Sequence, residues 1–508
     1  MQKIGLIIQA RTNSSRLKGK ILYKLDQNTL IEWVIKRAKK SNAHTVILAT
    51  SNKSNNTTLK KICLEEKINF FSGSEENVLQ RFYKASLKYK LDAVIRVCAD
   101  NPFIDSKEIN YLISSYKKDK KKKDYYFNHR NFKQHTFADG FGAELIKFQA
   151  LKKIYKNVKN KKDKEHVTSS IWHDPKSFNT HPCKTSVNKN FHHVVLDINN
   201  KHDFDKINRF IKDKKIKIKD SANKIANLYS KHEIKCYLKD LFSFNRSLAG
   251  NENRKTLNYL KKDIPLKIKN LKSGLKVFDW KIPKEWKINQ GYILNQGKKI
   301  IDYKNNNLHV ASYSQPIKKK LSFEELSKKL LTHKLRKAIP YRTLYYKKDW
   351  AFCLNKDDLK KIKKISQKKE KNKFEVLIDS SFKNGKMNYG EIIIPGKSKK
   401  EILISTYICH PSMANDNLSG VILTSLLTKY LTNFYQLNWS YRIVFVPETI
   451  GSIAYIHQNI EKFKKIDFGL NISCVGGKGN LSFKESWNSN HFINKLVKKI
   501  FYKKKIKF

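Results

Sequence analysis

The sequence predicts an α/β protein with two α/β domains and a small β-rich insert in the second. The chain has 508 residues, of which 40% are apolar and 12% aromatic, so it is long enough for two or three domains and can build large cores. Apolar segments typical of strands alternate with amphipathic segments of about 10–15 residues, first over residues 1–215 and again beyond residue 400. This alternation predicts βαβ units on mostly parallel sheets.

The first 215 residues predict a Rossmann-like sheet with helices on both faces. Amphipathic helices are expected over residues 30–40 and 76–89. The expected strands are residues 3–10, 44–50, 92–100 and 192–198. Parallel sheets of this kind bind ligands beyond the carboxyl ends of their strands. Residues that directly follow a strand are therefore the first candidates for function.

Residues 241–508 predict the second α/β domain, which follows a Lys-rich helical connector over residues 216–240. Short strands punctuated by Trp, Gly and Pro predict a β-rich insert at about residues 270–320, and a polar helix is expected over residues 321–334. The α/β pattern resumes with strands over residues 401–411, 441–448 and 468–477 and an apolar helix over residues 420–431.

The net charge of +61 comes from 105 Lys and Arg against 44 Asp and Glu, and it favours a polyanionic partner at first sight. However, only 12 of the basic residues are Arg, and the lysines run through every segment. A nucleic-acid site usually recruits Arg and concentrates its charge on one face. The abundance of Lys, Asn and Ile instead indicates an AT-rich genome. We expect no specific nucleic-acid partner, and a non-catalytic polyanion-binding protein stays as an alternative.

The cysteines and the apolar segments bear on the compartment. Seven cysteines are scattered singly and form no CxxC pair, which favours a reducing compartment. No apolar run approaches the ~18–20 residues of a membrane span, and the start of the chain lacks the features of a signal peptide. We expect a cytoplasmic protein without a membrane span.

A turn of small polar residues and cations directly follows the first expected strand. Its backbone N–H groups could cradle phosphate oxygens, and Arg11, Arg16 and Lys20 add three cations. A nucleoside triphosphate requires such groups when its α-phosphorus accepts a nucleophile and pyrophosphate leaves. A basic surface loop is the alternative. The predicted nucleotide-binding residues of this turn are Gln9, Ala10, Arg11, Ser15, Arg16 and Lys20, of which Arg16 and Lys20 are also predicted to be catalytic.

The motif IIQARxxSxRLxGKxL at residues 7–22 resembles the signature of cytidylyltransferases of the spore coat polysaccharide biosynthesis type. These enzymes are relatives of the acylneuraminate and 3-deoxy-manno-octulosonate cytidylyltransferases. The resemblance continues in order through VIRVCADNPFID (94–105), FADGFGAELI (137–146), EHVT (165–168) and VVLDINNKHDF (194–204). It covers about residues 1–215. It departs at Lys18, where proline is usual, and at Gly142, where relatives often carry an acidic residue.

The resemblance implies that Asp100 and Asp197 hold Mg²⁺ between the nucleotide phosphates and the acceptor. This agrees with the preference of Mg²⁺ for a few carboxylates plus phosphate and water oxygens. The resemblance also implies that Arg96 assists in binding the nucleotide and that Glu144 and His166 bind the sugar. Taken singly, each aspartate could instead be a turn residue and His166 a structural histidine.

A second polar cluster, CHPSMANDNLSG at residues 409–420, lies between an expected strand and the apolar helix. His410 and Asp416 at this spacing could bind one cation, and Zn²⁺ accepts both ligand types. Glu448 ends the next expected strand and could act as a general base beside a metal-bound water.

An uncharacterised aminopeptidase-like family, related to the co-catalytic zinc aminopeptidases, is similar to this chain over about residues 240–508. The similarity rests on the cluster and on four upstream blocks, FNRSLAG, LKVFDWKIPKEW, NNLHVASYSQP and AIPYRTLYYKKDWAFC. It implies that the histidine and aspartate are metal ligands and that the glutamate is the base. Thr449 and Ser473 stand where zinc aminopeptidases carry further carboxylates, and no block matches their last ligand histidine. We expect a domain that is incomplete at its carboxyl terminus, binds at most one Zn²⁺ weakly and hydrolyses little.

The sequence thus predicts a Mg²⁺-dependent nucleotidyltransferase of the cytidylyltransferase type, fused to an aminopeptidase-like domain. It would activate a sugar for surface polysaccharide biosynthesis. The expected partners are CTP or another nucleoside triphosphate, a sugar acceptor and, for a homodimer, a second copy of the chain. The alternative from another class is a zinc-dependent hydrolase with a regulatory nucleotide-binding domain. The sugar, the base of the nucleotide and the substrate of the second domain stay open.

Overall fold

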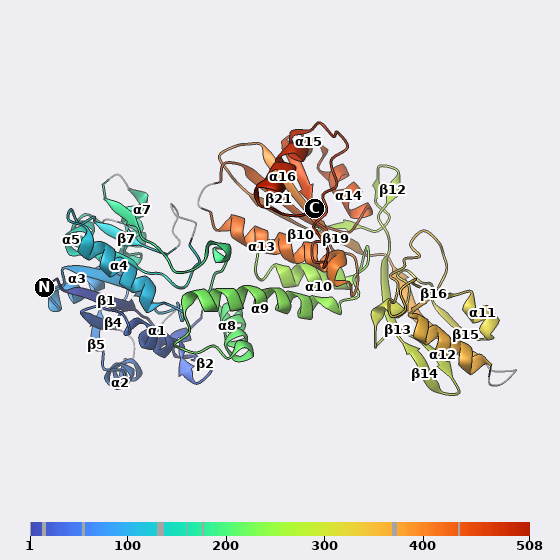
Figure 1. Cartoon of the computed structure of the whole chain (residues 1–508), viewed down its shortest axis with the longest axis horizontal. Coiled ribbons are helices and arrows are strands. Elements are labelled where there is room, and N and C mark those ends of the chain that lie inside the picture. Colours follow the sequence, from blue (N-terminus) through green and yellow to red (C-terminus); the bar gives the residue numbers. More distant parts are fainter. Residues whose placement is uncertain are drawn as a thin grey trace. The chain divides into compact units, whose positions relative to one another are not determined.

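The computed structural model divides into two compact units (Figure 1). The first comprises Met1–Ile234 and Asn433–Tyr435, and the second Lys235–Thr432 and Gln436–Phe508. The boundary falls inside the helix α9 (Ala222–Phe242), which occupies most of the residues predicted as a connector. The structure describes residues 2–12, 17–52, 56–129, 137–158, 160–174, 177–367, 373–434 and 437–508.

Seven of the described strands form one sheet in the first unit, in the order β5-β4-β1-β6-β8-β7-β9. Strands β5, β4, β1 and β6 run parallel, whereas β8 is antiparallel to both β6 and β7. The strands are β1 (Ile4–Gln9), β4 (Thr45–Ser51), β5 (Asn69–Gly73), β6 (Ala93–Cys98), β7 (Tyr125–Phe127), β8 (Glu144–Lys147) and β9 (Thr180–Pro182), with β2 (Lys24–Leu25) and β3 (Asn28–Thr29) as a separate pair. The predicted sheet of parallel βαβ units is confirmed.

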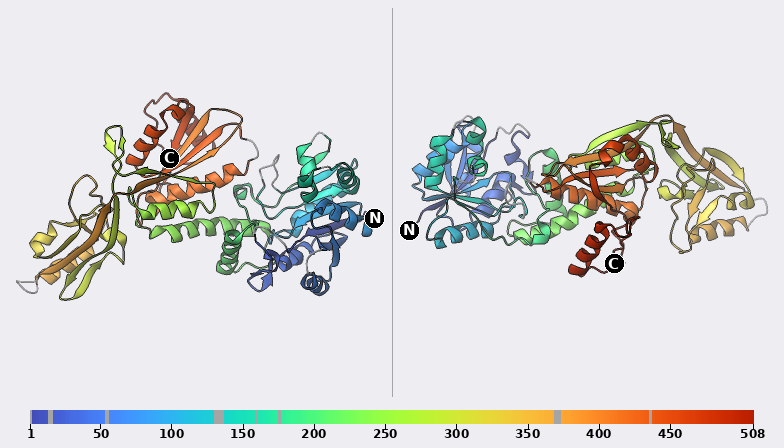
Figure 2. Two further views of the ribbon diagram at one scale, coloured as in Figure 1. Left: turned by 180° about the vertical axis from the view of Figure 1, so that it is seen from behind. Right: turned by 90° about the horizontal axis from the view of Figure 1, so that it is seen from above.

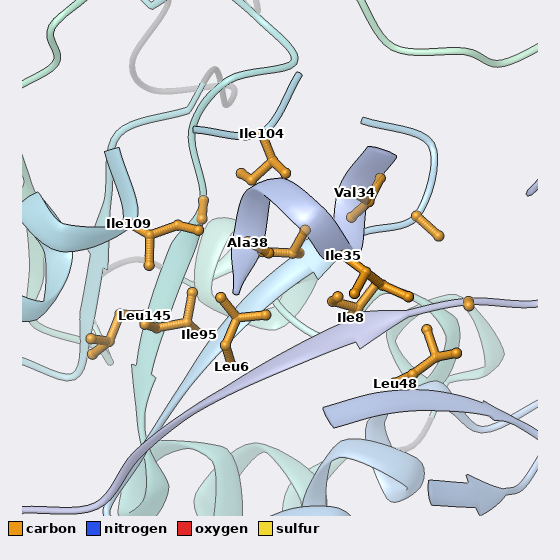
Figure 3. Packing of buried hydrophobic residues seen from close by; sticks show 14 of the residues in the cluster. Leu6, Ile8, Val34, Ile35, Ala38, Leu48, Ile95, Ile104, Ile109 and Leu145 are labelled. Atoms are coloured by element: carbon orange, nitrogen blue, oxygen red, sulfur yellow. The ribbon is translucent and has the colours of Figure 1, made fainter. Parts of the chain in front are cut away.

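Helices cover both faces of this sheet because successive side chains of a strand point to opposite faces. Leu6 and Ile8 of β1 face a core that contains side chains of α1, α2 and α4, and Figure 3 shows α1 lying across these strands. Ile7 faces the opposite core, which contains side chains of α3, α5 and α7. The helices of the unit are α1 (Leu30–Ala38), α2 (Thr57–Glu65), α3 (Val78–Lys88), α4 (Ser106–Lys118), α5 (Phe148–Asn157), α6 (Lys161–Glu165), α7 (Ser169–His173) and α8 (Lys201–Lys214).

Residues 192–198, expected as a strand, are not part of the sheet. The segment makes an isolated bridge between Val195 and Asp139, and the backbone N–H of Ile198 donates to the carbonyl oxygen of Asp100 at 3.0 Å. Its backbone groups thus bond to loop residues such as Asp100 and Asp139. The bridge is isolated, so the segment is not assigned as a strand. These contacts hold the segment beside the carboxyl end of β6.

Five described strands form the main sheet of the second unit, in the order β10-β19-β21-β20-β22. Strands β21, β20 and β22 run parallel, and β19 is antiparallel to its two neighbours. The helix α13 packs against β20 and β21, and α14 contributes to a core with β19 and β21. The elements are β10 (Lys267–Lys272), β19 (Lys386–Ile394), β20 (Glu401–Tyr407), β21 (Ser440–Val446), β22 (Ile466–Asn471), α10 (Asn251–Leu260), α13 (Gly420–Thr432), α14 (Ile450–Gln458), α15 (Ile460–Phe463) and α16 (Phe492–Lys503).

A second sheet of the same unit is antiparallel, in the order β14-β13-β18-β15. The helix α12 lies along it (Figure 2) and packs Ile362 into the core with Trp286 and Phe374. The elements are β13 (Glu285–Asn295), β14 (Lys298–Asp302), β15 (Ile317–Leu321), β18 (Phe374–Lys383) and α12 (Lys356–Ser366), with the short strands β11 (Lys276–Val277), β12 (Trp280–Lys281), β16 (Leu330–Thr332) and β17 (Phe352–Leu354). The β-rich part thus includes β18, well beyond the residues predicted as an insert.

The polar helix expected over residues 321–334 is shorter than predicted. The helix α11 (Phe323–Ser327) begins at a capping box in which Ser322 accepts from the backbone of Glu325, and β16 follows it directly. Leu326 alone of its side chains is buried, so little apolar area favours a longer helix. Among the described helices, none combines the length and the apolar character of a membrane crossing.

Candidate functional site

A polar pocket of about 580 Å³ opens at the carboxyl ends of β1 and β6 in the first unit. The residues that line it come from the ends of these strands, from the start of the antiparallel β8, from α6 and from the segment before α8. The pocket brings together eight of the predicted site residues, Gln9, Arg11, Lys20, Arg96, Asp100, Glu144, His166 and Asp197.

Among the predicted residues of the first unit that the structure describes, Ala10 does not line the pocket. Ala10 is buried, and its backbone N–H donates to the carbonyl oxygen of Ala49 at 3.0 Å, which continues the pairing of β1 with β4. Ser15 and Arg16 lie outside the described residues. Of the described residues predicted in this turn, Gln9, Arg11 and Lys20 therefore line the pocket.

Arg96 and Glu144 form a largely buried ion pair in the lining of the pocket. Arg96 also donates to Gln9 Oε1 at 3.1 Å, and the Tyr125 hydroxyl donates to Glu144 Oε2 at 2.6 Å. Burial by itself would raise the pKa of Glu144, but Arg96, His129 and Tyr125 outweigh burial and lower the pKa. Burial would lower the pKa of Arg96, whereas Cys98 and Glu144 raise it. Both groups therefore stay charged at neutral pH.

Asp100 and Asp197 lie on either side of one amide. With its nitrogen toward the carboxylates, the Asn101 side chain donates to Asp100 Oδ1 at 3.3 Å and to Asp197 Oδ1 at 3.0 Å. Two carboxylates that share one donor, beside open pocket volume, form an oxygen-rich set of the kind that Mg²⁺ prefers. The residues present therefore fit a magnesium ion.

Lys20 holds one of these carboxylates in place. Its side chain is largely buried, and Nζ donates to Asp100 Oδ2 at 3.0 Å and to the carbonyl oxygen of Ile198 at 2.6 Å. An ammonium group has three N–H donors, and two of those of Lys20 are used by the described residues, which leaves the third for a ligand as far as the described part of the chain shows. Gly19, in left-handed conformation at φ 68°, turns the chain so that Lys20 enters the pocket.

Arg11 forms an ion pair with Glu165 across the pocket, with Nη2 and Oε1 3.1 Å apart. Both side chains are about two-fifths exposed, at 40% and 43%. Sequence reasoning missed Glu165, although it stands directly before His166 in the EHVT block. It also missed His129 and Asp139, which line the same pocket. Asp139 lies in the FADGFG block, whereas no pattern pointed to His129.

Gly142 has no room for a side chain. A Cβ atom there would lie 2.3 Å from the carbonyl oxygen of Asn128, a backbone atom that cannot yield easily. The amide of Asn128 in turn donates to Glu108 and accepts from Ala143 N–H at 3.1 Å, which fixes the strand beside the pocket. The backbone packing therefore leaves no space for an acidic side chain at position 142.

Cys409, His410 and Glu448 form a compact cluster in the second unit. Among the described residues they are the one group of three His, Cys, Asp or Glu side chains whose ligand atoms all lie within 4.8 Å of one another. His410 and Cys409 follow β20, and Glu448 follows β21. Burial lowers the pKa of His410 although Asp416 and Glu448 oppose this, so its imidazole is neutral near pH 7. Burial raises the pKa of the Cys409 thiol to about 12.

Asp416, predicted as a metal ligand with His410, is absent from this group of three. Its carboxylate accepts a hydrogen bond from the Tyr407 hydroxyl at 2.5 Å. Thr449, in place of a second carboxylate, precedes α14 as its N-cap at φ 55°, and Ser473 follows β22. The residues present thus do not fit the two-metal centre of a co-catalytic zinc aminopeptidase, which requires several carboxylates around both ions.

Comparison with known proteins identifies both halves of the chain. Residues 6–262 match the cytidylyltransferase family, and residues 235–508 match a domain family of unknown function, DUF4910. A Clostridium acetobutylicum protein, named for polysaccharide biosynthesis and an aminopeptidase-like domain, is 44% identical over 270 residues, which cover 53% of this chain and 60% of the relative. The Bacillus subtilis spore coat polysaccharide biosynthesis protein SpsF is 36% identical over 121 residues, which cover 23% of this chain and 50% of that protein.

A crystal structure described as that of a peptidase from Clostridium acetobutylicum is also similar, with a TM-score of 0.50 and 43% identity. The match covers 54% of this chain and 63% of that chain. The chain thus spans less than two thirds of the length of each of these relatives. The two predicted resemblances are confirmed. The chain belongs to the cytidylyltransferase family through its first part and, through its aminopeptidase-like second part, to the DUF4910 family.

Proposed function

We propose that the first unit transfers a cytidylyl group from CTP to a sugar hydroxyl and releases pyrophosphate, and that the activated sugar serves polysaccharide biosynthesis. The observation that carries this proposal is one pocket, in the half that belongs to the cytidylyltransferase family, which combines cations from the turn after β1 with the carboxylate pair of Asp100 and Asp197. The names of the two relatives support the assignment to polysaccharide biosynthesis. The seven free cysteines support a reducing cytoplasm as its location.

In the proposed reaction the sugar oxygen bonds to the α-phosphorus, and the bond from that phosphorus to the bridging oxygen of the β-phosphate breaks. The hydroxyl proton leaves to water. In this proposal Arg11 and Lys20, which both line the pocket, stabilise the oxygens on which charge develops, and such stabilisation is usually the largest contribution to the rate. Mg²⁺, held by Asp100 and Asp197, would neutralise further phosphate charge.

Glu144 and His166 are proposed to bind the acceptor sugar. Both line the pocket, and the buried pairing of Glu144 with Arg96 fixes the orientation of its carboxylate. A carboxylate held in this way accepts hydrogen bonds from hydroxyl groups but repels a carboxylate of the ligand. The arrangement therefore supports recognition of sugar hydroxyls beside Glu144.

The test is pyrophosphate release with Mg²⁺ from CTP, ATP, GTP and UTP, each combined with a panel of neutral and acidic sugars. We expect release with CTP and one class of sugar, and a loss of about 10²–10³-fold in Lys20→Ala. Lys24→Ala, an exposed lysine of β2, is the matched control and should retain the parental rate. Release by Lys20→Ala at the parental rate, or no release with any pair, would overturn the proposal.

For the second unit we propose little or no aminopeptidase activity. The engagement of Asp416 by Tyr407, together with Thr449 and Ser473 in place of carboxylates, supports this. The check is hydrolysis of simple aminoacyl substrates together with elemental analysis of the purified protein. Brisk hydrolysis with two zinc ions per chain would instead favour a zinc-dependent hydrolase with a regulatory nucleotide-binding unit. Nucleic-acid binding that weakens steeply as the salt concentration rises would favour the polyanion-binding alternative.

A further inference from the structure

We propose that the helix α16 of the second unit docks on an anionic membrane surface. Its exposed apolar side chains would enter the boundary between lipid headgroups and acyl chains, and its lysines would contact the acidic headgroups. The helix would lie in the plane of the surface rather than cross it. The proposal concerns the second unit alone and does not depend on cytidylyl transfer in the first.

One side of α16 packs against the rest of the second unit. Ile493 is buried, and the ring of Phe492 meets that of Phe468 in β22 edge-on, with 5.1 Å between the centroids. The ring of Phe501 lies 6.5 Å from that of Phe483. Figure 2, in the view from above, shows the helix in dark red near the label C, projecting from the sheet. The helix is thus held by one side and leaves the other open.

The open side of α16 carries an apolar stripe. Phe492, Leu496 and Ile500 are four residues apart, so they lie one above the other along the helix. They are 47%, 39% and 45% exposed. Single apolar residues are normal on a protein surface, whereas a contiguous exposed row marks a binding site for a protein or a membrane.

The charges beside this stripe indicate an anionic partner. Residues 491–508 contain seven lysines and no Asp or Glu. Lys495, Lys499 and Lys503 form the row next to the stripe, again four residues apart, and all three are exposed. A lysine can lay its apolar stem along a hydrophobic surface while its ammonium group reaches outward to charged groups. The helix therefore offers apolar and cationic contacts on one side.

An acidic lipid surface matches both kinds of contact. It presents a layer of negative headgroups over an apolar interior, and an amphipathic helix gains affinity from each. Clusters of about four to eight basic residues on such a helix are typical of binding to acidic lipids. A second copy of the chain would instead bring the same lysines to the interface, where like charges repel. A nucleic acid would satisfy the lysines but offers no comparable apolar layer.

The first experiment is co-sedimentation of the full chain with vesicles of phosphatidylglycerol and phosphatidylcholine in equal parts. The double variant Lys495→Gln, Lys499→Gln should bind these vesicles about 10–30-fold more weakly. Because the whole chain is basic, the matched control is Lys360→Gln, Lys364→Gln, which removes two exposed lysines at the same spacing from α12. The control should stay within about threefold of the parental affinity, since charges farther than a Debye length from the surface are screened.

The second experiment tests the apolar stripe separately from the charge. Leu496→Gln, Ile500→Gln should lower vesicle affinity about tenfold. The residual binding, which is then electrostatic, should disappear at high salt. Leu423→Gln, Ile456→Gln changes two residues of α13 and α14 that are exposed to a similar extent, and it should bind as the parental protein does.

Amide hydrogen exchange locates the contact in the vesicle-bound chain. Residues 492–503 should exchange more slowly than in the free chain, and α12 should not change. Equal binding to vesicles of phosphatidylcholine alone, equal losses in the α12 control, or unchanged exchange over residues 492–503 would each overturn the proposal. So would vesicle binding that survives in Leu496→Gln, Ile500→Gln while sedimentation velocity shows the loss of a dimer, because the stripe would then join two copies. Pyrophosphate release should be parental in every variant, and it reports separately on the first unit.

Discussion

The pocket of the first unit and the cluster of the second differ in how many elements build them. The pocket gathers charged side chains from β1, β6, β8, α6 and the segment 192–198, and it contains three separate cation–carboxylate pairs. The cluster takes its three side chains from the loops after β20 and β21. A site with many contributing elements fixes each group through several partners, whereas a three-residue site depends wholly on each member.

Substitution of the two carboxylates proposed to hold Mg²⁺ should have the largest effect on activity. Asp100→Asn and Asp197→Asn keep the shape of the side chains but lose the charge that attracts a hard cation. We expect pyrophosphate release to fall about 10³-fold or more in each, equivalent to ~4 kcal/mol of transition-state stabilisation. Asp205→Asn, an exposed residue of α8, is the control. Parental rates in both pocket variants would place the metal elsewhere.

Glu144→Gln tests whether the buried ion pair of Arg96 and Glu144 stabilises the folded protein. The change leaves the Arg96 charge buried without its partner, which costs about 3–5 kcal/mol in unfolding free energy. Because the pKa of Glu144 is lowered in the folded protein, its stabilisation is present above the unfolded value of about 4.3 and is lost as the pH falls through the folded value. The difference between the parental protein and the variant, measured by urea unfolding, should therefore shrink in acid. A difference that grows in acid would contradict the lowered pKa.

Gly142→Ala tests the backbone that borders the pocket. The new methyl group would stand 2.3 Å from a backbone oxygen, so the strand must move, at an expected cost of about 1–3 kcal/mol. Gly479→Ala, where a Cβ meets no atom within 4 Å, is the matched control and should unfold at the parental temperature. Thermal unfolding followed by circular dichroism distinguishes the two. Equal melting temperatures would show that the backbone near Gly142 can move to accept the methyl group without loss of stability.

Glu165→Gln is the mildest change. It removes the carboxylate that competes with a nucleotide phosphate for Arg11, in a pair that is well exposed and therefore weak, at about 0.2–1 kcal/mol. The KM for CTP should fall by about two- to fivefold with little change in kcat. Glu65→Gln, an exposed glutamate of α2, should leave the KM unchanged. A rise in KM would show that Glu165 helps to bind the substrate.

The sequence predicted the pocket residues that directly follow strands, because the topology of a parallel sheet alone brings strand ends together. Asp100 stands two residues after β6 and Arg11 two residues after β1. The sequence did not predict Glu165, because tertiary packing brings α6 to the pocket and a local sequence pattern does not indicate such packing. Residues 192–198 were wrongly expected as a strand, because an apolar run cannot reveal that its backbone partners are loops.

In the second unit the fold class was predicted, but the convergence of particular side chains was not. The spacing of His410 and Asp416 allowed a shared cation, yet the direction of each side chain depends on tertiary partners such as Tyr407. Cys409 stands directly beside His410, and adjacent residues in an extended chain usually point apart. Its side chain joins the cluster because it sits in the loop after β20, where that alternation no longer holds.

We expect the three ion pairs of the pocket to make it selective among anions, which the net charge of +61 does not by itself suggest. Arg11, Lys20 and Arg96 are each held beside a carboxylate of the same unit, and a tethered partner has a high effective concentration. Chloride or acetate carries one charge, so it can replace the carboxylate partner of only one cation at a time. A triphosphate carries several charges on one framework and engages several cations in a single event. If the first unit binds a nucleoside triphosphate as proposed, we expect the pocket to select ligands by the number of charges they carry, and chloride or acetate should compete only weakly.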